Sequence, residues 1–191
     1  TQVFQTRSFW MLAISIFLLG MVTTPAQQQL VAYWTEAGNS PAFAATLYSA
    51  VMMVAIFTKI FLGAVYDSTS VSKGTMAVGT LAVASFLCLL LFPRGYAAAI
   101  PAILYGVTVS VQVLVGTYVV NRLFGDKEYA FVYGVLTPVL YGGVAVGSPL
   151  SAAVYDCTGS YQMLWIACAA VFAVGVGLVV LSDQISKREY L

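Results

Sequence analysis

The sequence predicts an all-α membrane protein with six transmembrane helices, arranged as an inverted repeat of three helices plus three. Composition is the first reason, because 61% of the 191 residues are hydrophobic and only 8% are charged, whereas soluble domains carry about 25% charged residues. The mean hydropathy is correspondingly high, at +0.92. The second reason is that long uncharged stretches separate the few charges. The third is a short motif that occurs in both halves of the chain.

Six stretches of low charge are each long enough to form a helix that crosses a bilayer. A hydrocarbon core of about 30 Å needs about 20 predominantly apolar residues in helical form. The stretches predict helices at residues 8–33, 41–66, 75–92, 97–123, 130–155 and 161–182. The second range qualifies only if its helix continues through Lys59 to Tyr66. Because every connection is short, we expect residues 1–191 to form a single six-helix bundle.

Proline and glycine mark where several of these helices end or bend. Pro93 and Gly95 end the third helix, and Gly159 marks the turn before the sixth. Within the first helix Pro25 removes a backbone N–H group, so we expect a kink with free carbonyl groups there. The polar residues around this proline are Thr23, Thr24, Gln27 and Gln28.

The basic residues near the helix ends indicate how the chain is oriented. Lys and Arg accumulate on the cytoplasmic side of membrane proteins. One side of the predicted bundle carries Arg7, Lys73, Arg122, Lys127, Lys187 and Arg188. The opposite side carries only Arg94. We therefore expect a multi-pass protein of the cell membrane, inner or plasma, with both termini in the cytoplasm.

A six-residue motif closes the second helix of each predicted set of three. Residues 64–69 read Ala-Val-Tyr-Asp-Ser-Thr, and residues 153–158 read Ala-Val-Tyr-Asp-Cys-Thr. In the predicted topology the second helix ends inside and the fifth ends outside, so the two copies have opposite orientations. Inverted repeats of three helices are one plan on which secondary transporters are built. Chance similarity between two short helix ends is the alternative.

What the sequence lacks disfavours several functional classes. A net charge of +1 provides no basic face for nucleic acid. Histidine is absent, which removes the commonest metal ligand and general base, and Cys88, Cys157 and Cys168 have no metal-binding spacing. Asp67 and Asp156 are predicted on opposite membrane faces, too far apart to share a proton as a protease pair does. We expect no enzyme activity, no metal or other cofactor and no nucleic-acid partner.

Three segments resemble the C-terminal half of major facilitator superfamily transporters. The family's eleventh helix and the loop after it are similar to the segment from Tyr133-Gly134 through Gly147-Ser148-Pro149-Leu150 to Tyr155-Asp156-Cys157-Thr158-Gly159-Ser160-Tyr161. Residues 122–125, Arg-Leu-Phe-Gly, resemble the link before that helix, and residues 63–67 resemble the loop motif between helices eight and nine. The likeness is closest to the monocarboxylate-porter and oxalate/formate-antiporter branch. Two departures are Ser148 in the place of a proline and Lys73 as the one remaining basic residue after Asp67.

This resemblance implies one half of a secondary active transporter, an antiporter or a symporter, that moves a small monocarboxylate-like organic anion by alternating access. The implied partners are the anion, the lipid bilayer and a second six-helix half, either upstream on the native chain or in a dimer. Because the chain opens with Thr1, we expect an upstream part. The alternatives are a major facilitator carrier for another solute, a sugar or a drug, and a structural or pore-forming membrane subunit.

Lys59 is the strongest candidate for a functional residue. It is the only charge well inside a predicted helix, and charged side chains within a membrane are energetically costly and commonly functional. Its helical stripe contains Tyr48, Met52, Ala55 and Gly63. The resemblance places Lys59 where related transporters carry a substrate-binding arginine, so we expect it to bind the anion. The alternative is a lysine that extends its ammonium group to the inner interface.

Further candidates are polar or small residues of the other helices. The expected substrate-binding residues, besides Lys59, are Tyr48, Gln28, Gln112, Tyr133, Thr137 and Tyr141. The expected gating or packing residues are Gly63, Asp67, Gly143, Gly147 and Asp156. Gly143 and Gly147 form a GxxxG pattern, which lets helices approach closely in lipid. Ordinary hydrogen bonding between helices is the alternative role for the polar residues.

Overall fold

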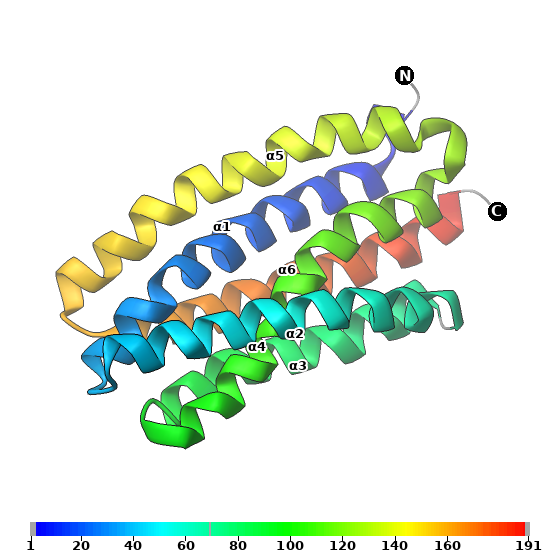
Figure 1. The fold of residues 1–191 in the computed structure, drawn as a ribbon. Coiled ribbons are helices and arrows are strands. Elements are labelled where there is room, and N and C mark those ends of the chain that lie inside the picture. The colour runs from blue at the N-terminus through cyan, green and yellow to red at the C-terminus, as the bar shows by residue number, and fades with distance from the viewer. Residues whose placement is uncertain (1–2, 69, 190–191) are drawn as a thin grey trace.

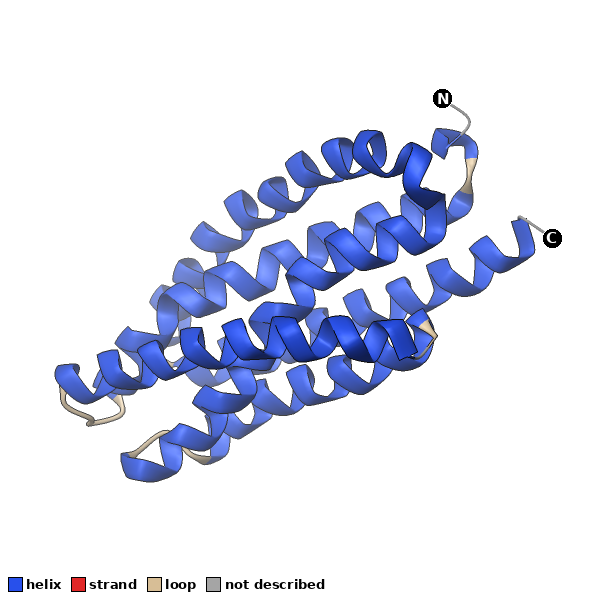
Figure 2. Cartoon of the chain, turned by 45° about the vertical axis from the view of Figure 1, so that its right-hand side comes forward, coloured by secondary structure: helices blue, strands red, loops and turns tan. Residues whose placement is uncertain are grey.

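The computed structural model describes residues 3–68 and 70–189, and within these ranges the chain forms helices and no strand (Figure 2). The long helices are α1 (Arg7–Glu36), α2 (Pro41–Ser68), α3 (Val71–Leu91), α4 (Ala99–Leu114), α5 (Val120–Thr158) and α6 (Tyr161–Glu189). Short 3-10 helices cover Val3–Gln5 and Gly95–Ala98. A π-helical segment, Val115–Val119, joins α4 directly to α5.

Five stretches of the described residues are long and apolar enough to cross a membrane. They are Arg7–Glu36, Pro41–Gly63, Ser72–Leu91, Gly95–Thr158 and Tyr161–Ser186. The shortest has 20 residues, which matches the length that a hydrocarbon core of about 30 Å requires. The chain is therefore an all-α, multi-pass membrane protein, as its composition predicts.

The stretch Gly95–Thr158 is 64 residues long and changes direction at Gly125. Gly125 has φ 75° and ψ 168°, which are far from helical values and lie in a region that is essentially restricted to glycine. The ribbon reverses at the yellow-green end of α5, so the parts before and after it run in opposite directions (Figure 1). The sequence predicts a connection over residues 125–129. That prediction is wrong beyond Gly125, because residues 126–129 are already helical.

Other helix boundaries differ from the predicted ones by a few residues. α1 continues to Glu36 and α6 to Glu189, past the predicted ends at residues 33 and 182. α3 begins at Val71, four residues before the predicted start, and ends at Leu91. The physical reason is that an apolar stretch defines which part of a helix suits lipid, whereas the backbone hydrogen bonds of the helix continue into the polar region beyond.

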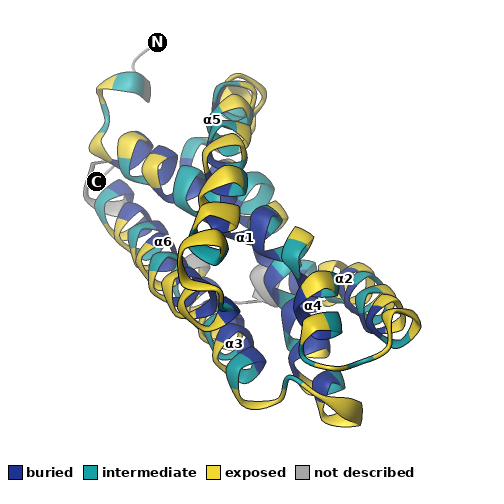
Figure 3. Cartoon of the chain, turned by 90° about the vertical axis from the view of Figure 1, so that its left-hand side faces the viewer, coloured by how far each residue is buried: buried dark blue, intermediate teal, exposed yellow. Residues whose placement is uncertain are grey.

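Two central helices organise the packing. α1 packs against α5 and α6, α4 packs against α2 and α3, and α3 and α6 also pack against each other. Where α3, α4 and α6 meet, the Phe86 ring lies 5.6 Å from the Tyr105 ring and 5.9 Å from the Phe172 ring. Buried residues lie where helices face one another (Figure 3). Large apolar side chains such as Ile60 and Phe61 are exposed on the outward faces, as contact with lipid requires.

Glycines bring α5 against α1. A Cβ atom on Gly143 would overlap the Phe17 carbonyl, and one on Gly147 would overlap the Met21 carbonyl. Pro25 lacks the N–H group that would bond the Met21 carbonyl within the helix. Gly147 therefore lies against a carbonyl that its own helix leaves free, where a Cα–H group can form a weak hydrogen bond. Small residues that permit such contact are typical of helix association in lipid.

Asn39 links two inter-helix connections through hydrogen bonds at one end of the bundle. Its side-chain nitrogen donates to the carbonyl groups of Trp34 (2.8 Å) and Pro93 (3.0 Å). Its side-chain oxygen accepts the N–H of Gly95 at 2.8 Å. The connection between α1 and α2 is thus held against the connection between α3 and α4.

Candidate functional site

A cavity of about 290 Å³ lies among α1, α4, the π-helical segment and α5. We call it the inter-helix cavity. Its lining residues are Ile16, Thr24, Gln27, Val109, Gln112, Val113, Gly116, Tyr133, Leu136, Thr137, Leu140 and Tyr141. Six of these residues carry polar side-chain groups, and the other six are apolar. This combination is typical of sites that bind small molecules.

Hydrogen bonds connect the polar wall of the cavity across three helices. Thr24 Oγ1 of α1 donates to Gln112 Oε1 of α4 at 3.4 Å. Gln27 Nε2, also of α1, donates to the Tyr48 hydroxyl of α2 at 2.9 Å and lies 3.7 Å from the Met52 sulfur. An amide side chain carries two N–H donors as well as a carbonyl oxygen. Gln27 and Gln112 can therefore offer donors to a bound carboxylate, carbonyl or hydroxyl group.

Two interruptions of regular helix structure adjoin the cavity. Pro25 lies in α1 between the lining residues Thr24 and Gln27. The π-helical segment contributes Gly116 to the wall. Irregular backbone at membrane depth is tolerated where it lines a cavity, and π-helical turns occur frequently at functional sites. The backbone interruptions and the polar side chains thus both lie at the inter-helix cavity.

One face of α5 forms the aromatic side of the cavity. Tyr133, Thr137 and Tyr141 follow one another at intervals of four residues, and all three line it. The Tyr133 ring stacks on the Tyr129 ring at a centroid distance of 5.5 Å, and the Thr137 hydroxyl donates to the Tyr133 carbonyl at 2.8 Å. Tyr141 is 65% exposed, so the cavity opens to the surface beside it.

The structure brings together five of the predicted binding residues. Gln112, Tyr133, Thr137 and Tyr141 line the cavity, and Tyr48 is joined to it through Gln27. Two further predicted residues, Gln28 and Lys59, do not line it. Gln28 is exposed, and its Oε1 accepts a hydrogen bond from Ser148 Oγ at 3.4 Å.

Lys59 is exposed on α2 at about the depth of the cavity. α2 and α4 run in the same direction (Figure 1), and Ser110 Oγ of α4 donates to the Ala55 carbonyl of α2 at 3.0 Å. At 1.5 Å per residue, Lys59 lies about 6 Å beyond Ala55 and Gln112 lies about 3 Å beyond Ser110. Lys59 and Gln112 therefore lie at similar depths in the bundle.

The predicted gating and packing residues lie away from the cavity wall. Gly143 and Gly147 pack against α1. A Cβ on Gly63 would meet nothing within 4 Å, and Asp156 is exposed near the end of α5. The side chain of Asp67 lies outside the part of the chain that the structure describes, as does residue 69 at the end of the first motif copy.

Sequence reasoning missed two features of the cavity, the π-helical segment and the glycine that it contributes to the wall. The π-helical segment and its Gly116 carry no marker residue, so nothing in the sequence indicates them. Gln27 lines the cavity, and its neighbour Gln28 does not. A signal for Gln27 does exist, because Thr24 and Gln27 are three residues apart and so share one helix face.

No family model and no curated protein matches the chain, so its function is inferred below from the residues and geometry of the site.

Proposed function

We propose that the chain is one six-helix half of a secondary transporter that moves a small organic anion by alternating access. The observation that carries the proposal is the inter-helix cavity, whose polar groups and irregular backbone lie at the depth of an intramembrane lysine. Transporter sites typically lie near the bilayer midplane, where interrupted helices meet. The other half is a second six-helix bundle, upstream on the native chain or in a second copy.

Six crossings are favoured because Gly125 divides the longest apolar stretch into two antiparallel parts. Residues 95–124 and 126–158 each exceed the roughly 20 residues that one crossing needs. α1 begins and α6 ends at the same end of the bundle (Figure 1), as an even number of crossings requires. Lys and Arg concentrate at that end, which favours the cytoplasm for it.

An inverted repeat is supported by the pattern of helix packing. If the segment 126–158 of α5 counts as the fifth helix, α1 contacts the fifth and sixth helices as α4 contacts the second and third. Exchanging the first three helices with the last three therefore reproduces the same pairs. The exchange relates α1 to α4, α2 to the fifth helix, and α3 to α6.

Individual residues follow the same relation. A shift of 89 residues carries the motif at 64–69 onto the motif at 153–158. The same shift carries Phe17 onto Gly106 and Val54 onto Gly143. Gly143 packs against Phe17, and a Cβ on Gly106 would lie 2.7 Å from the Val54 Cβ. The exchange of the two sets of helices therefore carries one contact onto the other. The glycine lies on the fifth helix in the first contact and on the fourth helix in the second.

The interruptions of the two central helices also correspond. Shifting Pro25 by 89 residues gives position 114, and the π-helical segment begins at the next residue, Val115. Interrupted helices at equivalent positions of two repeats are a good indicator of a transport site. This agreement supports the cavity between α1 and α4 as the place where substrate binds.

The chemistry of the residues favours a small monoanion. Lys59 supplies one positive charge, and a lysine binds a carboxylate as a point charge, without the two-pronged geometry of arginine. Gln27, Gln112 and Thr24 supply hydrogen-bonding groups, and the apolar wall accommodates a short carbon chain. We propose no chemical conversion of the substrate, since the site has neither histidine nor a cysteine among its lining residues.

A neutral solute such as a sugar is the second candidate. The specific observation in its favour is that the residues lining the cavity carry no formal charge, while Lys59 stands outside the lining. Hydroxyl groups of a sugar would find both donors and acceptors in Gln27, Gln112 and Thr24.

Counterflow into vesicles that contain the complete native transporter tests the proposal, with acetate, lactate, oxalate and a hexose as solutes. Lys59→Gln should reduce carboxylate uptake by roughly tenfold or more, because a charge-assisted contact is lost. Lys127→Gln, a change at an exposed lysine of α5 that does not line the cavity, is the matched control and should leave uptake unchanged. Unaltered carboxylate uptake by Lys59→Gln would contradict the anion proposal, and uptake of hexose alone would support the second candidate.

A further inference from the structure

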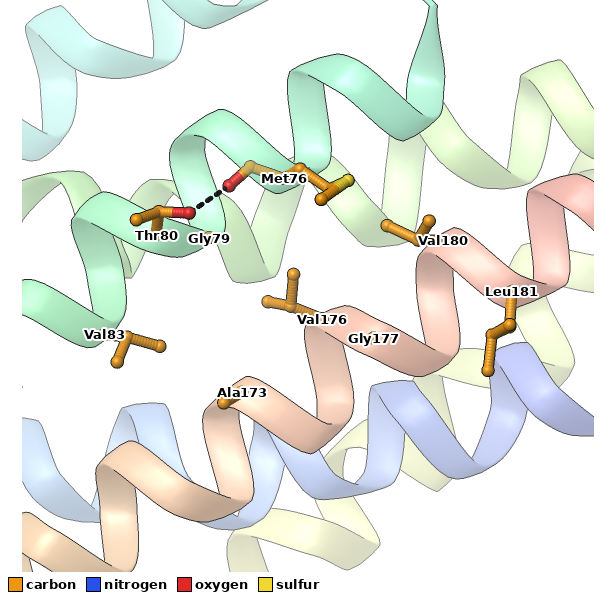
Figure 4. A pocket seen from close by; sticks show the side chains of 9 residues that line it. All are labelled: Met76, Gly79, Thr80, Val83, Ala173, Val176, Gly177, Val180 and Leu181. Atoms are coloured by element: carbon orange, nitrogen blue, oxygen red, sulfur yellow. Dashed lines mark hydrogen bonds between the residues drawn. The ribbon is translucent and has the colours of Figure 1, made fainter.

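A larger cavity, of about 490 Å³, lies between α3 and α6, neither of which contributes to the inter-helix cavity. We call it the α3–α6 groove (Figure 4). Its wall includes Met76, Gly79 and Val83 of α3 and Val176, Gly177 and Leu181 of α6. Val176 points from α6 toward α3 and closes the base of the groove beside Gly79.

The surface of the α3–α6 groove is aliphatic. Thr80 brings the only hydroxyl group among the lining residues, and this group donates to the Met76 carbonyl of its own helix at 2.8 Å. Met76 is 57% exposed and Leu181 is 45% exposed, so the groove opens outward. In a membrane-spanning chain this outward face meets lipid. A ligand suited to the groove is therefore a flexible hydrocarbon chain.

Charge distinguishes one end of the groove. Lys73 is exposed and lies about one helical turn before Met76. Asp183 lies at the same end on α6, but it is only 5% exposed and accepts a hydrogen bond from Ser72. Among the described side chains of α3 and α6 at this end, the accessible charge is therefore positive. An anionic group attached to the hydrocarbon chain would find its partner there.

We propose that the α3–α6 groove binds an acyl chain of an anionic phospholipid whose phosphate pairs with Lys73. Along α3 the distance from Lys73 to Val83 is about 15 Å at 1.5 Å per residue. This is half of a hydrocarbon core of about 30 Å. The groove and its lysine thus span one leaflet, from the level of the phosphates to the midplane. The proposal does not depend on which solute the chain transports.

Gly177 offers the variant that tests binding of the acyl chain. A Cβ there would meet nothing within 4 Å, so Gly177→Leu fills the groove without displacing a helix. Gly134 of α5 has equally open surroundings, which makes Gly134→Leu the matched control. Lipids retained by the purified protein are counted by native mass spectrometry, with phosphatidylglycerol and phosphatidylcholine as the anionic and zwitterionic probes. Wild type and Gly134→Leu should retain both lipids, whereas Gly177→Leu should lose them.

Lys73→Gln tests the contact with the head group. We expect wild type to prefer phosphatidylglycerol about fivefold, the usual contribution of one basic residue near anionic lipid. Lys73→Gln should abolish this preference, and Lys127→Gln should preserve it. Because Lys73 is exposed, its replacement leaves the packing between helices intact even if Gly177→Leu perturbs folding. Undiminished retention by folded Gly177→Leu, or a preference that survives Lys73→Gln, would overturn the proposal. A dimer that Gly177→Leu dissociates would overturn it too, because the groove would then hold a second copy of the chain.

Discussion

Gln27 connects the inter-helix cavity to α2 through one side chain. It lines the cavity from α1, donates to Tyr48 of α2 at 2.9 Å and lies 3.7 Å from the Met52 sulfur. Its neighbour Gln28 points instead toward Ser148 and is exposed. The adjacent amides therefore differ in position: Gln27 lines the cavity and Gln28 does not, so Gln28 can serve as the control position.

Gln27→Leu should raise the KM of transport about fivefold, since a hydrogen-bonding group of the cavity is worth about 1 kcal/mol. The measurement is initial uptake as a function of solute concentration. Gln28→Leu introduces the same side chain one position away and should leave KM unchanged. Equal effects of the two substitutions would exclude the cavity as the binding site.

Gly147→Ala should destabilise the fold by about 1–3 kcal/mol, the usual effect of overpacking a tight contact. Its new methyl group would overlap the Met21 carbonyl of α1. Gly134→Ala places the same methyl group on the same helix with nothing within 4 Å, and a gain in helix propensity should stabilise that variant slightly. Unfolding of both variants in mixed micelles measures the difference. Identical stabilities would show that α5 does not touch α1 at Gly147.

Residue spacing was enough to group Tyr133, Thr137 and Tyr141, because a four-residue interval keeps side chains on one helix face. It was not enough to choose between Gln27 and Gln28. One residue along a helix turns the side chain by about 100°, and in lipid both sides of a helix are apolar, so the sequence shows no polar outer face for orientation. The contacts of Gln27 with α2 and of Gln28 with α5 determine which amide lines the cavity.

At the scale of helices, each uncharged stretch overlaps a long helix of the structure, because the thickness of the bilayer sets the length of an apolar helix. The interruptions were only partly predictable. Pro25 indicates an interruption because proline lacks an N–H group, but no residue type marks the π-helical segment Val115–Val119. The turn at Gly125 was expected, although its compactness was not. One residue outside the helical region is sufficient for the reversal.

Gly125 and Gly159 should respond differently to asparagine. Gly159 has φ 63° and ψ 18°, the left-handed helical region that asparagine tolerates. Gly125 has φ 75° and ψ 168°, a region that is essentially restricted to glycine. We therefore expect Gly125→Asn to cost about 1–3 kcal/mol and Gly159→Asn much less. Thermal unfolding of the two purified variants checks this order, and a reversed order would refute the backbone geometry at Gly125.

At the scale of the whole molecule, the pairing of helices decides where the cavity lies. Hydropathy could not predict this pairing, because lipid tails are as apolar as the faces that helices bury against each other. Small residues gave a partial signal, since Gly143 and Gly147 do face α1. The hydrogen bonds by which Asn39 links two connections had no signal in the sequence, because polar residues are common in loops. The cavity follows from the packing of α1, α4 and α5 together.

Thiol labelling of intact cells should report the orientation of the bundle. Cys157 is exposed at the end of α5, whereas Cys168 is buried. If the end with most Lys and Arg is cytoplasmic, a membrane-impermeant maleimide added outside should modify Cys157, and Cys157→Ser should abolish the signal. In that background, a cysteine introduced by Lys73→Cys should react only after the cells are opened. Labelling of the Lys73→Cys variant in intact cells, with Cys157 silent, would mean that the orientation is reversed.

Pro25 and Gly147 are far apart in the chain, yet they meet through a single atom, the Met21 carbonyl oxygen. A lineage that replaced the proline would restore the hydrogen bond inside α1. The carbonyl would then withdraw from α5, and selection for glycine at position 147 would relax. The two residues should therefore be inherited together among homologous chains and lost together, with the proline as the first to go. Changes in the opposite order would have to pass through ancestors with a disrupted bundle.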